Sequence, residues 1–248
     1  MPHLFLKKDH FNENTGFQTR NAILTLTPYA PKVLMIGTYN DGGNANNQAD
    51  FFYGRNYFWP IFENFSQNNR ALSQRRFAAN QQGIANANPP TLQRILILCS
   101  QFKLTFADLI QDVLIPLPNH DDTYLNQAVG AGQTTNNHEN IAKFINDTPS
   151  IEDVYLTTAL QGYPHLNGLW EYIVQHSRGN VTFRKILTPS GRGNIPAIPN
   201  QVSAVQKIAR YWVWVNDPAS PNGVVMNATF HQMNHEWLIQ SGVNPMIY

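Results

Sequence analysis

The chain has 248 residues, 42% of them hydrophobic and 13% charged, and its formal net charge is +1. This length and apolar share suit one well-packed domain, and the near-neutral charge excludes a strongly basic nucleic-acid binder, leaving any such binding to local patches. Cys99 is the single cysteine, so the chain forms no internal disulfide and no multi-cysteine metal site. The sequence has no run of 18 apolar residues, and its first residues lead us to expect no signal peptide. We therefore expect a cytoplasmic protein without a membrane span.

The first part of the chain alternates apolar runs with polar segments. Residues 21–26 fit a short strand or an arm, and residues 32–38 suit a buried central strand. Residues 57–65 predict an amphipathic helix. Its apolar residues recur at helical spacing: Phe58, Ile61, Phe62 and Phe65. Residues 67–90 are rich in Asn, Gln and Ala, which indicates a polar insertion or a mobile helix-and-loop segment.

The remainder of the chain continues this alternation. The predicted helices cover residues 92–101, 136–146, 168–176 and 202–214, and the predicted strands cover residues 154–158 and 182–187. Thr91 can cap the first of these helices, with Leu92, Ile95, Leu96 and Cys99 facing inward. The pattern favours an α/β fold, a three-layer α/β/α sandwich on a central, mainly parallel sheet. We expect a single domain over residues 1–248, with an insertion around 67–90 and a C-terminal appendage at 218–248.

Polar residues follow the first predicted strand directly. Gly37 ends this strand and permits a tight turn and a close backbone approach to a ligand. Thr38, Tyr39, Asn40 and Asp41 then present polar groups at the strand end. In the cleavage of a glycosidic bond, a carboxylate or amide at such a place stabilises the cation-like sugar or holds the attacking water. An ordinary Asn-Asp-Gly-Gly turn explains the same residues.

An aromatic motif lies between this turn and the helix predicted at 57–65. It reads Phe-Phe-Tyr-Gly-Arg-Asn-Tyr-Phe-Trp over residues 51–59. An enzyme that flips a base out of the duplex needs an aromatic platform and a group that reads the edge of the base. Phe52 or Tyr53 offers the ring, and Asn56 offers a donor and an acceptor together. Phe58 and Trp59 fit the core instead, because of their helical spacing.

A second polar turn follows the strand predicted at 182–187. It reads Thr-Pro-Ser-Gly-Arg over residues 188–192, and Arg184 and Lys185 precede it. Ser190 and nearby backbone amides can hold a phosphate, and Arg192 can enter the duplex where a base has left it. A common loop with a solvent-facing arginine is the alternative. Because ligands of open parallel sheets bind at the carboxyl ends of the strands, we expect both motifs to face one site.

The order of these motifs resembles the uracil-DNA glycosylase superfamily, most closely its mismatch-specific uracil and hypoxanthine-DNA glycosylase branches. The residues that carry the resemblance are Phe52-Tyr53-Gly54, Asn56-Tyr57-Phe58-Trp59 and the turn at 188–192, and the similarity covers roughly residues 33–212. The resemblance implies a monomeric DNA repair enzyme that flips a deaminated base, uracil or hypoxanthine, and hydrolyses its N-glycosidic bond without metal or cofactor. Arg192 falls on the family's wedge position. A single cysteine excludes the iron–sulfur branches.

The family's catalytic position, two residues after the strand-end glycine, holds Tyr39 in this chain. A phenol does not replace the carboxylate or amide that positions water, so we expect Asn40 and Asp41 to serve in its place. Two alternatives stay open: an inactive member of the fold that binds nucleic acid or a free base, and an enzyme acting on another small substrate. His231 and His235 have zinc-ligand spacing but lack the glutamate of the zinc motif, so no metal site is expected.

Overall fold

The computed structural model describes residues 29–39, 57–70, 92–190, 204–213 and 230–248, together with the backbone of four short strands. These strands form two antiparallel pairs, β1 (Phe11–Asn12) with β2 (Gly16–Phe17) and β4 (Asn47–Ala49) with β5 (Phe52–Tyr53). Of the predicted insertion at 67–90, residues 67–70 lie within the described part of the chain. There they form a turn in which the N–H of Gln67 bonds the carbonyl of Glu63.

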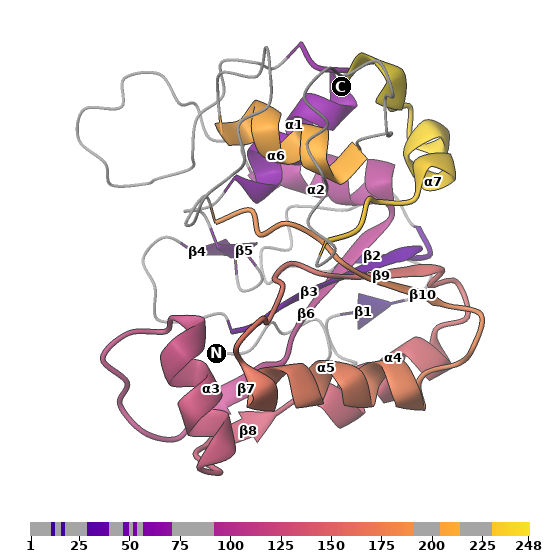
Figure 1. Ribbon diagram of the computed structural model, residues 1–248. Helices are drawn as coiled ribbons and strands as arrows, with labels where there is room; N and C mark the ends of the chain where they lie inside the picture. Colours follow the sequence, from indigo (N-terminus) through magenta and orange to yellow (C-terminus); the bar gives the residue numbers. More distant parts are fainter. Residues whose placement is uncertain are drawn as a thin grey trace.

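A parallel sheet lies at the centre of the described part of the chain (Figure 1). Its strands are β3 (Val33–Gly37), β6 (Leu104–Asp108), β9 (Asp153–Leu156) and β10 (Thr182–Lys185), in the order β10-β9-β3-β6. The predicted strands at 32–38, 154–158 and 182–187 correspond to β3, β9 and β10. No strand is predicted from the sequence over β6. The expectation of an α/β fold on a mainly parallel sheet is confirmed.

Helices cover both faces of this sheet (Figure 1). We call one the α1 face; its helices are α1 (Phe58–Ser66), α2 (Leu92–Phe102), α6 (Ala204–Val213) and α7 (His235–Gln240). The opposite α5 face carries α3 (Asp122–Gly130), α4 (His138–Asp147) and α5 (Pro164–His176). Side chains of a strand alternate between faces. Accordingly, Val33 and Met35 of β3 lie in the core of the α1 face, and Leu34 and Ile36 lie in the core of the α5 face.

The core of the α1 face is rich in aromatic rings. Phe62 packs against Phe58, Phe102 and Trp212 with ring centroids 4.8, 5.0 and 5.9 Å apart. Such tilted and edge-to-face pairs stabilise a core beyond the area they bury. This packing explains the helical spacing of aromatic residues in α1. It also confirms that Phe58 and Trp59 belong to the core.

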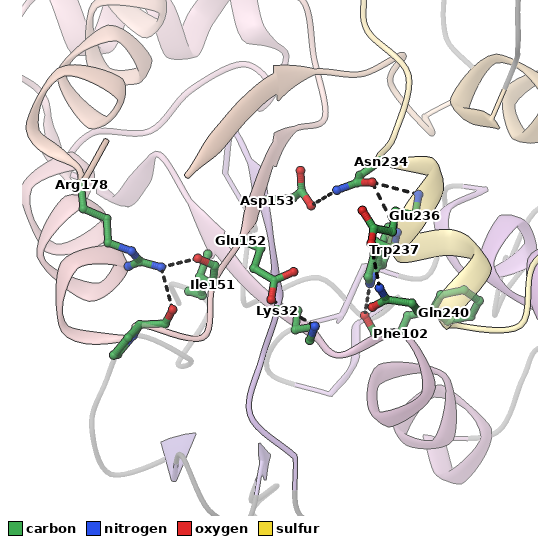
Figure 2. A network of polar contacts seen from close by, with 11 residues as sticks. Lys32, Phe102, Ile151, Glu152, Asp153, Arg178, Asn234, Glu236, Trp237 and Gln240 are labelled. Carbon is green, nitrogen blue, oxygen red and sulfur yellow. Dashed lines mark hydrogen bonds and ion pairs between the residues drawn. The ribbon is translucent and has the colours of Figure 1, made fainter. Parts of the chain in front are cut away.

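The C-terminal residues 230–248 complete this core. They include α7 and a short 3-10 helix, Pro245–Ile247, and bury Trp237, Leu238 and Tyr248. Asn234 Nδ2 donates to Asp153 Oδ2 over 2.9 Å, and Trp237 Nε1 donates to the Phe102 carbonyl over 3.1 Å (Figure 2). The segment predicted as an appendage thus contributes, over these residues, to the centre of the fold, because its apolar side chains cover the α1 face.

The path of the chain through the sheet creates a switch point. From β3 the chain passes through α1 and α2 on the α1 face to reach β6. From β6 it passes through α3 and α4 on the opposite face, skips β3, and enters β9. The chain therefore leaves β3 toward β6 and leaves β9 toward β10, which are opposite directions along the sheet. In open α/β sheets, ligands bind beyond the carboxyl ends of strands at such a point.

Candidate active site at the carboxyl edge of the sheet

Both polar motifs follow strands that end at the same edge of the sheet. Thr38 and Tyr39 follow β3, and residues 186–190 follow β10, and these strands are parallel to their common neighbour β9. Thr157 ties β9 to β3 at this edge, because its N–H and its hydroxyl both donate to the carbonyl of Ile36 over 3.0 and 3.1 Å. The carboxyl edge of the parallel sheet therefore carries the candidate active site.

A hydrogen bond joins the aromatic motif to the second polar turn. The N–H of Tyr57, just before α1, donates to the carbonyl of Pro189 over 2.8 Å. The turn is held further by Trp212 Nε1, which donates to the carbonyl of Leu187 over 2.8 Å, and by the N–H of Ser190, which donates to Thr188 Oγ1 over 3.3 Å. Segments about 130 residues apart in the sequence are thus fixed against each other.

Gly37 is required by its neighbour in the sheet. It pairs with Asp108 at the end of β6, and a Cβ at position 37 would lie 2.5 Å from Asp108 Oδ1. That separation is well below van der Waals contact, so no other residue fits without movement. The sequence pattern predicts a close approach of ligand at this glycine. In the structure, the group that approaches it is the carboxyl of Asp108, which is 3% exposed.

Tyr39 packs beside the loop that precedes α3. Its ring meets that of His120 edge to face with centroids 5.1 Å apart, and it lies against the core of the α5 face. The side chain of Tyr39 is half-buried, whereas His120 is exposed. Tyr39, which the resemblance places at a catalytic position, therefore contributes to packing between the end of β3 and the loop before α3.

Asp122 brings a carboxyl group to the switch point, and it belongs to none of the motifs predicted from the sequence. Thr158 Oγ1, just after β9, donates to Asp122 Oδ2 over 3.3 Å, and the hydroxyl of Thr38, just after β3, lies near enough to lower the pKa of this carboxyl. Burial raises the pKa of Asp122 above its ordinary value, the two threonine hydroxyls oppose that rise, and the nearby charge of Asp121 adds to it. The N-terminus of α3 acts in the same sense as the hydroxyls, because a helix N-terminus stabilises a carboxylate by about 0.3–1 kcal/mol.

The sequence carried only a weak signal for this carboxyl. Asp121-Asp122 stands before a helix, where acidic residues commonly serve as caps. Its place against Thr38 and Thr158 depends on residues 84 and 36 positions away, which no local pattern contains.

The loop after β9 has an unusual backbone, in which the buried Leu160 adopts φ 53°. A left-handed backbone at a bulky residue is a strained conformation that persists only where surrounding structure enforces it.

The predicted site residues fall into two groups. Gly37, Thr38, Tyr39 and Ser190 lie at the carboxyl edge described above. Outside the described residues lie Asn40, Asp41, Asn56 and Arg192, together with the side chains of Phe52 and Tyr53, of which only the backbone in β5 is described. The prediction that Cys99 faces inward from α2 is confirmed, because Cys99 is buried. The side chains of Leu92, Ile95 and Leu96, predicted to face the same way, lie outside the described residues.

The basic residues before the second turn have internal partners. Arg184 Nη1 lies 2.5 Å from Oδ1 of Asp153, a carboxylate that is 1% exposed. Lys185 Nζ donates to Asn167 Oδ1 over 2.6 Å, and burial lowers the pKa of this lysine. The Arg184 guanidinium therefore neutralises a buried charge within the fold.

His235, one of the two residues considered as zinc ligands, has a structural role. His235 Nε2 forms a hydrogen bond with the carbonyl of Val213 over 2.9 Å, which ties α7 to the end of α6. Among the residues that the structure describes, no three His, Cys, Asp or Glu side chains lie close enough to hold a metal ion.

The described helices include none with the length and apolar character needed to cross a membrane.

Comparison of the chain with family models, with curated proteins and with solved structures finds no match in any of the three.

Proposed function

We propose that this protein is a DNA glycosylase that flips a deaminated base, uracil or hypoxanthine, out of duplex DNA and hydrolyses its N-glycosidic bond. The observation that carries the proposal is the 2.8 Å hydrogen bond between Tyr57 and Pro189. It joins the aromatic motif and the Thr-Pro-Ser turn, the two segments on which the resemblance rests. Both adjoin the carboxyl side of a parallel sheet, where ligands of such folds bind.

In this proposal each motif has a separate task. Phe52 or Tyr53 stacks on the flipped base and Asn56 reads its edge, since a flipped base is recognised by stacking and by hydrogen bonds to its polar edge. Ser190 and adjacent amides hold a backbone phosphate, and Arg192 fills the space that the base has left. Asn40 and Asp41 stabilise the cationic sugar or position water. The chemistry needs neither metal nor cofactor.

The proposal is tested by incubating the protein with duplexes that contain uracil, hypoxanthine or xanthine. Strand cleavage at the resulting abasic site after alkaline treatment reports release of the base, and an undamaged duplex of the same sequence is the substrate control. We expect release of at least one deaminated base. Duplex binding without release from any of the three would contradict the proposal and favour a binding protein on the same fold.

The role of Asn40 is tested by Asn40→Ala. A group that acts on developing charge lowers turnover without weakening ground-state binding, so we expect a fall in turnover of about 100-fold, with duplex affinity retained. The matched control is Asn180→Ala, because Asn180 is exposed in the turn before β10, at the amino edge of the sheet. Full turnover in Asn40→Ala would move the assignment to Asp41 or another group.

A further inference from the structure

Asp122 lies at the switch point between β3 and β9, and its position at the start of α3 does not by itself account for the partners of its carboxyl. It is the first residue of α3, yet its carboxyl accepts a hydrogen bond from the Thr158 hydroxyl after β9 and lies near the Thr38 hydroxyl after β3. It therefore lies beside the carboxyl ends of the two strands between which the chain changes direction. The hydrogen bond from Thr158 holds the carboxyl in place, and the residue as a whole is only partly buried.

The neighbouring Asp121 provides a contrast within the same helix end. Asp121 is the exposed N-cap residue of α3, and its side chain makes no cap hydrogen bond. Either aspartate would stabilise the helix through its dipole. Of these two, Asp122 is the one that accepts a hydrogen bond from Thr158 and has the Thr38 hydroxyl close to its carboxyl.

The groups around Asp122 act on the pKa of its carboxyl in both directions. From β3 and β9 the facing groups are the Thr38 and Thr158 hydroxyls, and from its own helix end the charge of Asp121. Beside it, Thr123 Oγ1 lies 3.4 Å from the phenol oxygen of Tyr163, which precedes α5, and the exposed His120 lies two residues before it. Burial and Asp121 both raise the pKa of the carboxyl, which makes its ionised form a stronger base.

We propose that Asp122 is a further catalytic residue of this site and acts as the general base for water. This inference rests on the proposed glycosylase function. The bond between the base nitrogen and C1′ breaks, and its electron pair leaves with the base. The oxygen of water bonds C1′, and the water proton passes to the Asp122 carboxylate. Deprotonation of Asp122 then returns the proton to the departed base or to solvent, so neither oxidant nor reductant is needed.

Among the residues that the structure describes, other groups near the strand ends fit this role less well. Tyr39 is a phenol whose ring packs against His120. Asp108 is nearly inaccessible, and its carboxyl lies against the backbone of Gly37. Asp122 combines partial exposure with a hydrogen bond from Thr158 and the nearby hydroxyl of Thr38, and a positioned base requires such fixed neighbours.

The test compares Asp122→Asn with the matched variant Asp121→Asn, each of which removes one negative charge from the start of α3. Asparagine has the shape of aspartate and can keep the hydrogen bond from Thr158, but it cannot accept a proton from water. We expect single-turnover release of the base to fall by about 100-fold to 10,000-fold in Asp122→Asn, the range that general-base catalysis contributes. Affinity for the same duplex should be unchanged, and Asp121→Asn should keep the wild-type rate at neutral pH.

The outcomes separate the two proposals. If the wild type releases no base, the proposed function fails and the role of Asp122 fails with it. If the wild type is active, a loss below about tenfold in Asp122→Asn, an equal loss in Asp121→Asn, or a matching loss of duplex affinity overturns the role of Asp122 alone. If Asp122→Asn does not fold, Thr158→Val tests the same carboxyl. Loss of that hydroxyl should move the acid limb of the rate to higher pH, and an unmoved limb overturns the proposal.

Discussion

Replacing Gly37 by alanine tests how tightly the strand ends pack at the site. The new Cβ would lie 2.5 Å from Asp108 Oδ1, whereas ordinary contacts are 3.4–4 Å, so the carboxyl or the strand must move by about 1 Å. Forcing extra atoms into a packed interior costs about 1–3 kcal/mol, while removing a strand glycine gains about 0.5–1 kcal/mol. The clash outweighs that gain, and we expect the free energy of unfolding to fall by about 1–2 kcal/mol.

Urea unfolding followed by tryptophan fluorescence measures this change, and Gly168→Ala is the matched control. Gly168 lies inside α5, where an added Cβ meets no atom within 4 Å, so alanine should stabilise the protein by about 0.5–1 kcal/mol. In an Asp108→Ala background the cost of Gly37→Ala should largely vanish, because the group it meets is gone. A Gly37→Ala protein as stable as the wild type, or the same cost in both backgrounds, would refute the close packing of these strand ends.

Two further predictions concern the proposed chemistry. If Asp122 must be ionised to accept a proton, the rate of base release should fall as the pH drops through its raised pKa, at a higher pH than for an ordinary aspartate. Asp121→Asn removes a like charge, so it should move this acid limb of the pH–rate profile to lower pH. A pH–rate profile with the limb of Asp121→Asn at or above that of the wild type would contradict this. Arg192→Ala should weaken duplex binding and lower the salt slope of log affinity by about one, as expected for a lost phosphate contact. Equal slopes for wild type and variant, measured by fluorescence anisotropy across a salt series, would make Arg192 an ordinary surface residue.

Local pattern was sufficient for much of the fold. The apolar run at 32–38 predicts β3, and the helical spacing of Phe58, Ile61, Phe62 and Phe65 predicts α1, because periodicity reflects which side of an element is buried. Alternation of strands and helices was enough to expect a parallel sheet with helices on its faces. The motifs at 37–41 and 188–192 could likewise be placed at strand ends, since a polar turn follows a buried strand in each.

Contacts between distant segments decided the rest. β6 was missed because its five residues, Leu-Thr-Phe-Ala-Asp, carry no clear alternation, and all of them are buried between β3 and the helices. The C-terminal residues 230–248 show no local sign that Trp237 and Tyr248 enter the core. Their burial depends on the surface that α1 and α2 leave uncovered.

The chemistry of the site shows the same division. Sequence alone indicates a polar edge, because Thr38, Tyr39 and Ser190 follow predicted strands. It does not indicate that Gly37 makes room for Asp108, or that Asp122 reaches Thr38 and Thr158. Both features arise from strand order: β9 and β6 come to lie on either side of β3 only in the folded sheet, and residues far apart in the chain then share one edge.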